Sequence, residues 1–164
     1  MLQELFARPY QSVSQLGKRL GVPVPVASVY LRALNARGLL TARRSGKQVF
    51  YTVEANETIR GCSELVAALR AMFAHHPHPA DAIFRHATAF THPRRIDIIR
   101  ALRGSVLPPK ELSRITGISS YAMKRHLGKL EQRGFVRRLP DGRYRTAAPP
   151  DRFSQTLVRI ARGI

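Results

Sequence analysis

The sequence is poor in the residue types that usually strengthen a small core. Tryptophan is absent, aromatic residues make up 7% of the 164 residues, and Cys62 is the single cysteine. One cysteine cannot form a disulfide within the chain, so we expect a reducing compartment and a core of aliphatic side chains. Hydrophobic residues still account for 44% of the chain, which favours a folded protein over a disordered one.

Long apolar runs are also missing. No run approaches the roughly 18 residues that a membrane-spanning helix needs. The first ten residues, MLQELFARPY, lack the basic flank and apolar centre of a signal peptide. We therefore expect a protein of the cytoplasm.

Acidic residues are scarce as well: 10 Asp and Glu stand against 28 Lys and Arg, a formal net charge of +18. Residues 1–77 carry +6 (10 minus 4) and residues 78–164 carry +12 (18 minus 6). Such an excess destabilises the folded state by self-repulsion and typically accompanies a polyanionic partner. The sequence has no Gly-rich phosphate loop and no nucleophile beside a candidate base, so we predict a protein that is not an enzyme and needs no cofactor.

The sequence does contain an internal repeat. LNARGLL (34–40) is followed ninety-six residues later by LEQRGFV (130–136). The same shift gives seven identities over the thirty-one positions 16–46, where a random pairing gives roughly two. The identical pairs are Leu16 and Leu112, Gly21 and Gly117, Leu31 and Leu127, Leu34 and Leu130, Arg37 and Arg133, Gly38 and Gly134, and Gly46 and Gly142.

Each copy predicts two helices, a tight turn between them, and a β-hairpin. Gly21 and Gly117 suit the left-handed C-cap of the first helix, and Met123, Leu127 and Leu130 form one buried stripe at i, i+4, i+7. The helices are expected at 12–21 and 25–37 in the first copy and at 108–117 and 120–133 in the second. The hairpins are expected at 39–53 and 135–147, with turns at Ser45-Gly46 and Asp141-Gly142. The sequence therefore predicts a mainly α protein with small β-hairpin wings, a tandem winged helix-turn-helix or pseudo-dimer.

Both copies resemble bacterial winged-helix regulators of the ArsR/MarR type, the second more closely. HPRRIDIIRAL (92–102) is similar to the first core helix of that family, and ISSYAMKRHLGKLEQRGFV (118–136) to its recognition helix and first wing strand. The resemblance covers nearly all of the second half and about residues 10–53 of the first. It implies the winged-helix fold, binding to double-stranded DNA, and flanking helices that form a dimer.

Packing helices are expected to connect and flank the two copies. Ile59, Cys62 and Phe73 lie on one face of a helix predicted in 54–76, and another helix is predicted in 81–90. The C-terminal helix is expected to bury Phe153, Leu157, Ile160 and Ile164. Prolines mark HPHPAD (76–81) as a linker, which gives domains 1–77 and 78–164. A monomeric pseudo-dimer is the simplest arrangement, and a homodimer with four winged helices is the alternative.

DNA binding needs cations for phosphate and side chains that reach base edges. In the second recognition helix the candidates are Ser119, Ser120, Tyr121, Lys124, Arg125 and Lys129, of which Lys124 and Arg125 are the strongest. The first recognition helix offers Ser28 and Arg32, and we expect it to discriminate sequence less. The wings are expected to contact phosphate or the minor groove through Arg43, Arg44 and Lys47, and through Arg143 and Arg145.

Other residues near these candidates have different expected roles. His126 is expected to be a partly buried scaffold residue, whereas Arg37 and Arg133 are expected to interact with the negative C-terminal ends of their helices. Gly128 either allows close approach to DNA or is a tolerated surface glycine.

Metal binding is not expected, although Cys62 and the histidines of HHPHP (75–79) are possible ligands and ArsR relatives often bind metal. Many of those relatives carry paired cysteines on the helix before the recognition helix, but this segment here is SQLGKRLG (14–21). Prolines also separate the histidines. We therefore predict no metal site and a buried, inert Cys62.

Together these features predict a double-stranded DNA-binding transcriptional regulator, associated with the nucleoid, that uses two winged-helix units. One alternative is an architectural, nucleoid-type DNA-binding protein with little sequence specificity, which the poor first recognition helix favours. Another is a winged-helix interaction module of a replication or segregation assembly, and the +18 charge counts against it.

Overall fold

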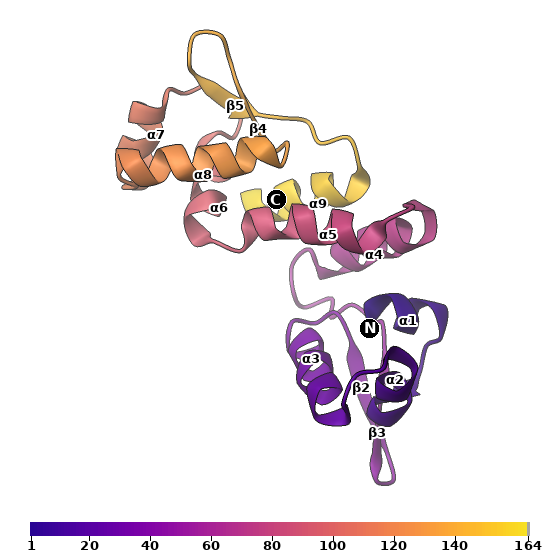
Figure 1. Ribbon diagram of the computed structural model, residues 1–164. Coiled ribbons are helices and arrows are strands. Elements are labelled where there is room, and N and C mark those ends of the chain that lie inside the picture. The colour runs from indigo at the N-terminus through magenta and orange to yellow at the C-terminus, as the bar shows by residue number, and fades with distance from the viewer. Residues whose placement is uncertain (164) are drawn as a thin grey trace. The chain divides into compact units, whose positions relative to one another are not determined.

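The computed structural model describes residues 1–163, which belong to two units (Figure 1). Unit 1 is Met1–His76 and unit 2 is Pro77–Ile164. Helices with small antiparallel β-hairpins build both units, as the sequence predicts. The predicted contribution of Ile164 to the C-terminal helix lies outside the described residues.

Unit 1 combines four helices with a small sheet in the described chain. Its elements are α1 (Leu2–Ala7), β1 (Gln11–Ser12), α2 (Val13–Leu20), α3 (Val24–Ala36), β2 (Thr41–Ser45), β3 (Gln48–Thr52) and α4 (Cys62–His75). The sheet is antiparallel in the order β1-β3-β2, with Gln11 opposite Tyr51 and Arg43 opposite Phe50. The sequence does not predict β1, because Ser12 is expected there at the start of a helix.

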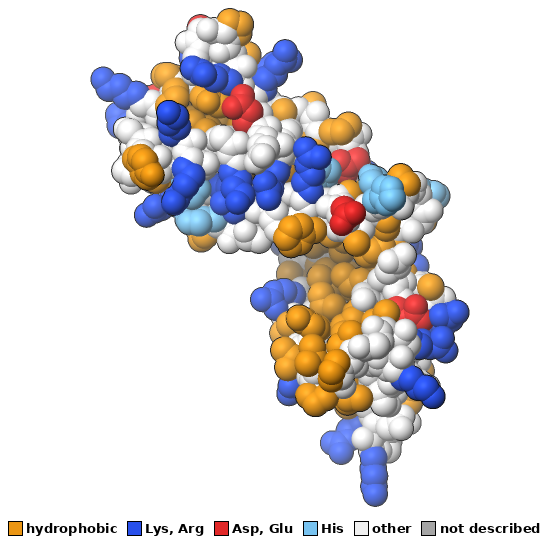
Figure 2. All heavy atoms as spheres, viewed as in Figure 1, with side chains coloured by type: hydrophobic (Ala, Val, Ile, Leu, Met, Phe, Trp, Pro, Cys, Tyr) orange, Lys and Arg blue, Asp and Glu red, His pale blue; other side chains and the backbone are white. Residues whose placement is uncertain are grey.

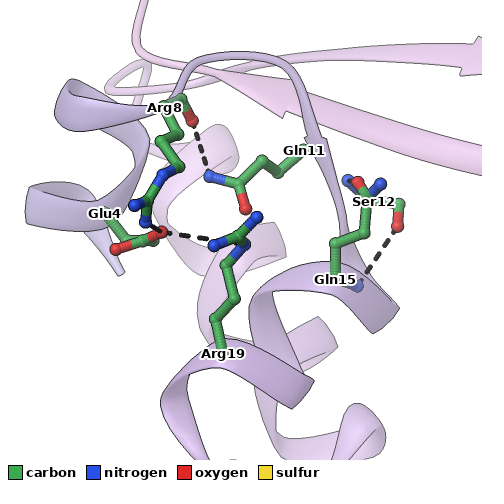
Figure 3. A network of polar contacts seen from close by, with 6 residues as sticks. All are labelled: Glu4, Arg8, Gln11, Ser12, Gln15 and Arg19. Carbon is green, nitrogen blue, oxygen red and sulfur yellow. Dashed lines mark hydrogen bonds and ion pairs between the residues drawn. The ribbon is translucent and has the colours of Figure 1, made fainter.

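Polar contacts fix the start of α2 and connect it to α1 (Figure 3). Ser12 Oγ accepts a hydrogen bond from Gln15 N (3.3 Å), and Gln15 Oε1 accepts one from Ser12 N (2.8 Å), which together form a capping box. Glu4 of α1 forms ion pairs with Arg8 (2.8 Å) and with Arg19 of α2 (3.9 Å).

The turn between α2 and α3 depends on glycine. Gly21 caps α2 in the predicted left-handed conformation, with φ of 62°. Val22 N donates to Gly17 O (2.9 Å), and a Cβ on Gly17 would lie 2.8 Å from Val22 O. Beneath the turn the core of unit 1 consists of Leu5, Leu16, Leu31, Leu40, Tyr51, Val53, Cys62 and Val66.

Helix α4 begins later than the sequence predicts. Gly61, with φ of 78°, is its N-cap, so Ile59 lies in the preceding turn and is 39% exposed. The assignment of Ile59 to the buried face of a helix is therefore wrong. Cys62 is buried, as predicted, and its Sγ donates to Gly38 O (3.0 Å).

Unit 2 has the same order of helix, turn, helix and hairpin, placed between other helices. Its elements are α5 (Pro79–Ala87), the 3₁₀ turn η1 (Thr88–Phe90), α6 (Pro93–Ala101), α7 (Pro109–Thr116), α8 (Ser120–Gln132), β4 (Val136–Arg138), β5 (Tyr144–Thr146) and α9 (Arg152–Arg162). Helix α5 begins at Pro79, inside the predicted linker 76–81, because proline fits the first turn of a helix.

The core of unit 2 fixes the position of α8. Gly117 caps α7 with φ of 67°, and α8 starts three residues later. Strand β4 pairs antiparallel with β5, and Leu107 forms a bridge with Tyr144 of β5. The largest buried side chains of unit 2 are Ile98, Ile99, Leu102, Leu112, Met123, Leu127, Leu130, Phe135 and, as predicted, Phe153 of α9.

Helix α9 is held to α5 and α6 by polar contacts. Buried Ser154 donates from Oγ to Asp151 Oδ2 (2.7 Å) and also hydrogen-bonds to His86 Nδ1 of α5. Arg100 Nε of α6 donates to Ala161 O of α9 (2.9 Å). Helix α9 therefore packs as a flanking helix within its own unit.

Within residues 1–163 there is no helix whose length and hydropathy would allow it to cross a bilayer.

Candidate nucleic-acid interface

Helix α8 is anchored by one face and exposed on the other. Met123, Leu127 and Leu130 are at most 1% exposed, which confirms the predicted stripe. Ser119 is the N-cap, and its Oγ accepts a hydrogen bond from Ala122 N (3.4 Å), also as predicted. The buried stripe therefore determines which side chains of α8 face solvent.

The exposed face of α8 carries cations and hydroxyl groups. Tyr121 is 84% exposed. From Ser119 to Leu130 the chain contains no Asp or Glu. Figure 2 shows a row of Lys and Arg side chains across the part of unit 2 in which α8 lies. The exposed polar side chains of this segment are Ser119, Ser120, Tyr121, Lys124, Arg125 and Lys129, which are all the residues predicted here.

His126 lies on the buried side of α8, and the prediction that it belongs to the scaffold is confirmed. Its side chain is 2% exposed, and its ring centroid lies 4.6 Å from that of His92, the N-cap residue of α6. Burial lowers the pKa of His126, and the nearby His92 and the guanidinium groups of Arg95, Arg125 and Arg94 lower this pKa further. The neutral imidazole is thus the form that the fold favours.

The wing of unit 2, β4 and β5, carries two exposed arginines, Arg137 and Arg138, in addition to the predicted Arg143 and Arg145. Arg137 lies directly opposite Arg145 in the strand pair, and both are exposed. Arg143 is exposed too, but its Nε is 2.7 Å from Asp141 Oδ2. The hydrogen bond from the backbone N–H of Arg143, followed by that from its side chain, lowers the pKa of Asp141. Arg137 and Arg138 are missing from the predicted residues, although FVRR directly follows Gly134 and the alternation of the strand places Arg137 beside Arg145.

The wing of unit 1, β2 and β3, carries the three predicted cations at its exposed tip. Arg43, Arg44 and Lys47 are all exposed. Arg43 Nη2 lies 3.7 Å from Glu54 Oε2, and Arg44 Nε donates a hydrogen bond to Gly46 O (3.3 Å). Both contacts are on exposed side chains and leave the charges accessible.

Helix α3 differs from α8 in what it exposes. Ser28 is half-buried, and the exposed Arg32 donates from Nε to the backbone oxygen of Ser28 (3.3 Å), a bond that does not involve the Ser28 hydroxyl. Around them α3 exposes apolar side chains, namely Val24, Val26, Val29 and Tyr30.

The two arginines at the ends of these helices behave differently. Arg37 Nη1 donates to Ala33 O (3.0 Å) in the last turn of α3, the interaction expected with a helix C-terminus. Arg133 instead donates from Nη2 and Nε to Thr88 Oγ1 (3.0 and 3.2 Å) and connects the end of α8 to η1. Neither guanidinium group is directed toward the exposed face of its helix by these bonds.

Residues 90–138 match the model of a family described as a helix-turn-helix domain. The match extends from η1 through α6, α7 and α8 to β4. No curated protein and no solved structure matches the chain. Unit 2 therefore contains a helix-turn-helix domain, in which α8 is the helix that follows the turn after α7.

No group of three or more His, Cys, Asp or Glu side chains is placed to hold a metal ion among residues 1–163.

Proposed function

We propose that the protein is a double-stranded DNA-binding transcriptional regulator whose helix α8 enters the major groove. The observation that carries this proposal is the exposed face of α8, which presents three cations and three hydroxyl groups on a helix-turn-helix domain. In such domains the second helix contacts base edges, mainly near its N-terminus.

The chemistry of α8 suits this role. Arg125 and Lys124 can donate to the acceptors O6 and N7 of guanine. Ser119 and Ser120 begin the helix, where backbone N–H groups and the helix dipole favour a phosphate. Tyr121 is 84% exposed, so its ring and hydroxyl group are accessible to DNA.

The wings would contact the phosphates of the DNA backbone beside the recognition helix. Like charges directly opposite each other destabilise a strand pair, and Arg137 and Arg145 are such a pair. A phosphate between the two guanidinium groups would remove the repulsion. Because Arg143 is paired with Asp141, we expect a smaller contribution from it.

Unit 1 would act as a second winged helix of the ArsR/MarR kind, so that one chain forms a pseudo-dimer. Its order of α2, turn, α3, β2 and β3 supports this, and so do the seven positions between 16 and 46 that are identical in unit 2 after a shift of 96 residues. Arg43, Arg44 and Lys47 would contact phosphate. Base contacts by Ser28 and Arg32 stay a prediction, which the apolar surroundings of both side chains weaken.

Selection of the purified full chain against a random duplex library at near-physiological salt tests the proposal. A regulator enriches a motif, and a pseudo-dimer enriches two unequal half-sites about one helical turn apart. Salt-sensitive binding without enrichment would contradict sequence recognition and favour the architectural alternative. The matched control is the same selection with Lys124→Ala/Arg125→Ala, which should lose the motif.

A further inference from the structure

A groove of about 740 Å³ lies between α1, α2 and α3 in unit 1. Leu2 of α1, Leu20 of α2 and Val22 of the turn form part of its lining. Helix α3 forms the remaining wall through Tyr30 and Leu34, four residues apart. The groove is thus predominantly apolar, and α3 lines it over about two turns, from Tyr30 to Arg37.

The apolar surface continues from the groove around α3. Val24, Val26 and Val29 are 49%, 42% and 55% exposed, and Tyr30 is 57% exposed. Figure 2 shows hydrophobic side chains gathered over α3. A contiguous apolar patch on a soluble protein marks an interaction site. Four large apolar side chains on one short helix form such a patch.

Two of the helices that line the groove, α2 and α3, carry charges of one sign. Helices α2 and α3 contain Lys18, Arg19 and Arg32 and not one Asp or Glu, and Arg37 lines the groove at the end of α3. The nearest carboxylate of α1, Glu4, is already paired with two arginines. The patch is therefore an apolar surface with a cationic edge.

The apolar surface and the positive charge beside it indicate which kind of partner can bind here. A second copy of the chain would bring identical cations against Arg32 and Arg37, because a two-fold contact joins the same surface of both copies. DNA bases would find hydrocarbon where donors are needed. An amphipathic helix with carboxylates beside its apolar stripe matches both the groove and its edge.

We propose that the surface formed by α1, α2 and α3 binds an amphipathic helix of another protein, one whose apolar stripe is flanked by Asp and Glu. Unit 2 and the wing of unit 1 are then left for DNA. In the bound state the partner's apolar side chains fill the groove beside Tyr30, and its carboxylates face Arg32 and Arg37. The protein would thereby connect DNA to an acidic partner.

Three synthetic helical peptides of about 18 residues, or five turns, test this with the full chain. The first has a Leu stripe flanked by Glu, the second has Lys in place of Glu, and the third has Ser in place of Leu. Fluorescence anisotropy measures the affinity of each. We expect saturable binding of the first and affinities weaker by about tenfold or more for the other two, since both apolar burial and charge are needed.

Exposed tyrosines on corresponding helices provide a matched pair of variants. Tyr30→Ala should weaken binding of the Glu-flanked peptide by about tenfold, whereas Tyr121→Ala of α8 should leave it unchanged. Val29→Ser is a second variant on the patch, and circular dichroism checks the fold of all three. Because these side chains are exposed, their loss should not unfold unit 1.

Several results would overturn the proposal. These are no saturable binding of the Glu-flanked peptide up to about 1 mM, the weak limit of specific recognition, and equal binding of the Glu-flanked and Lys-flanked peptides. Equal weakening by Tyr30→Ala and Tyr121→Ala would mean that the peptide does not bind specifically to the surface formed by α1, α2 and α3. Self-association that sedimentation detects in the wild type and not in Tyr30→Ala would assign the patch to a second copy.

Discussion

Helices α3 and α8 show how one scaffold can carry two different surfaces. A shift of 96 residues aligns buried Leu31 with Leu127, which are 0% and 1% exposed. Both helices are thirteen residues long and follow a glycine-capped helix. The same shift aligns buried Ala27 with Met123, whereas buried His126 corresponds to Tyr30, which is 57% exposed.

The exposed positions of the same alignment are not equivalent. Ser28 stands where α8 has Lys124, and Val29 stands where it has Arg125. The third cation, Lys129, corresponds to Ala33. Buried positions thus determine that a helix packs in this place, while the solvent-facing ones determine which partner it can bind. We therefore expect α8 to discriminate DNA sequence more strongly than α3.

The largest expected effect tests that difference directly. Lys124→Ala/Arg125→Ala removes two candidate base contacts, each worth about tenfold or more in discrimination, so specific binding should weaken by about a hundredfold. Binding to non-specific DNA should weaken far less. Titration of the selected duplex and of a scrambled duplex at one salt concentration measures both.

Ser28→Ala/Arg32→Ala is the counterpart in α3. If α3 does not recognise bases, this variant changes the ratio of specific to non-specific affinity by less than about threefold, the range of context effects on a surface contact. Equal losses on both duplexes for the α8 variant would instead assign Lys124 and Arg125 to phosphate and contradict the comparison.

A smaller effect is expected at the wings, where the two units should resemble each other. Replacing Arg43 and Arg44 by Ala should lower the salt slope of DNA binding by up to about 2, one for each lost phosphate contact. Replacing Arg137 and Arg145 should do the same in unit 2. The measurement is log affinity against log salt concentration for the non-specific duplex.

The change in salt slope shows whether both units contact DNA or only one of them does. An unchanged slope for Arg43→Ala/Arg44→Ala would mean that the wing of unit 1 does not contact DNA. Arg143→Ala is a useful control. Because Arg143 is paired with Asp141, we expect this variant to change the salt slope less than Arg137→Ala or Arg145→Ala does.

Much of the fold could be predicted because it depends on periodic and local signals. The spacing of Met123, Leu127 and Leu130 predicts the buried face of α8, and Gly21 and Gly117 predict the ends of α2 and α7. These features lie within a few residues of one another in the chain. The same local signals predict which side chains of α8 are exposed.

The features that the sequence did not reveal depend on partners distant in the chain. Strand β1 exists because Gln11 and Ser12 pair with β3, about forty residues later. Arg133 follows its helix end as Arg37 does, yet it binds Thr88, a residue present only in the packing of unit 2. Likewise the apolar groove requires α1 beside α3, which no local pattern indicates.

The smallest expected effect concerns two helical glycines and has opposite signs in the two units. A Cβ on Gly17 would lie 2.8 Å from the backbone oxygen of Val22, so Gly17→Ala should destabilise unit 1 by about 1–3 kcal/mol. Apart from its chain neighbours and the backbone of α8 itself, a Cβ on Gly128 would meet no heavy atom of residues 1–163 within 4 Å, so Gly128→Ala should stabilise unit 2 by about 0.5–1 kcal/mol.

Urea denaturation gives both free energies of unfolding, and the same proteins can be titrated with DNA. Because Gly128 lies on the exposed side of α8, higher stability combined with lower DNA affinity would mean that the DNA backbone approaches this glycine closely. Unchanged affinity would make Gly128 an ordinary surface position. If Gly128→Ala were destabilising, the packing described for α8 would be wrong at that point, because in the described part of the chain no other element opposes the added methyl group.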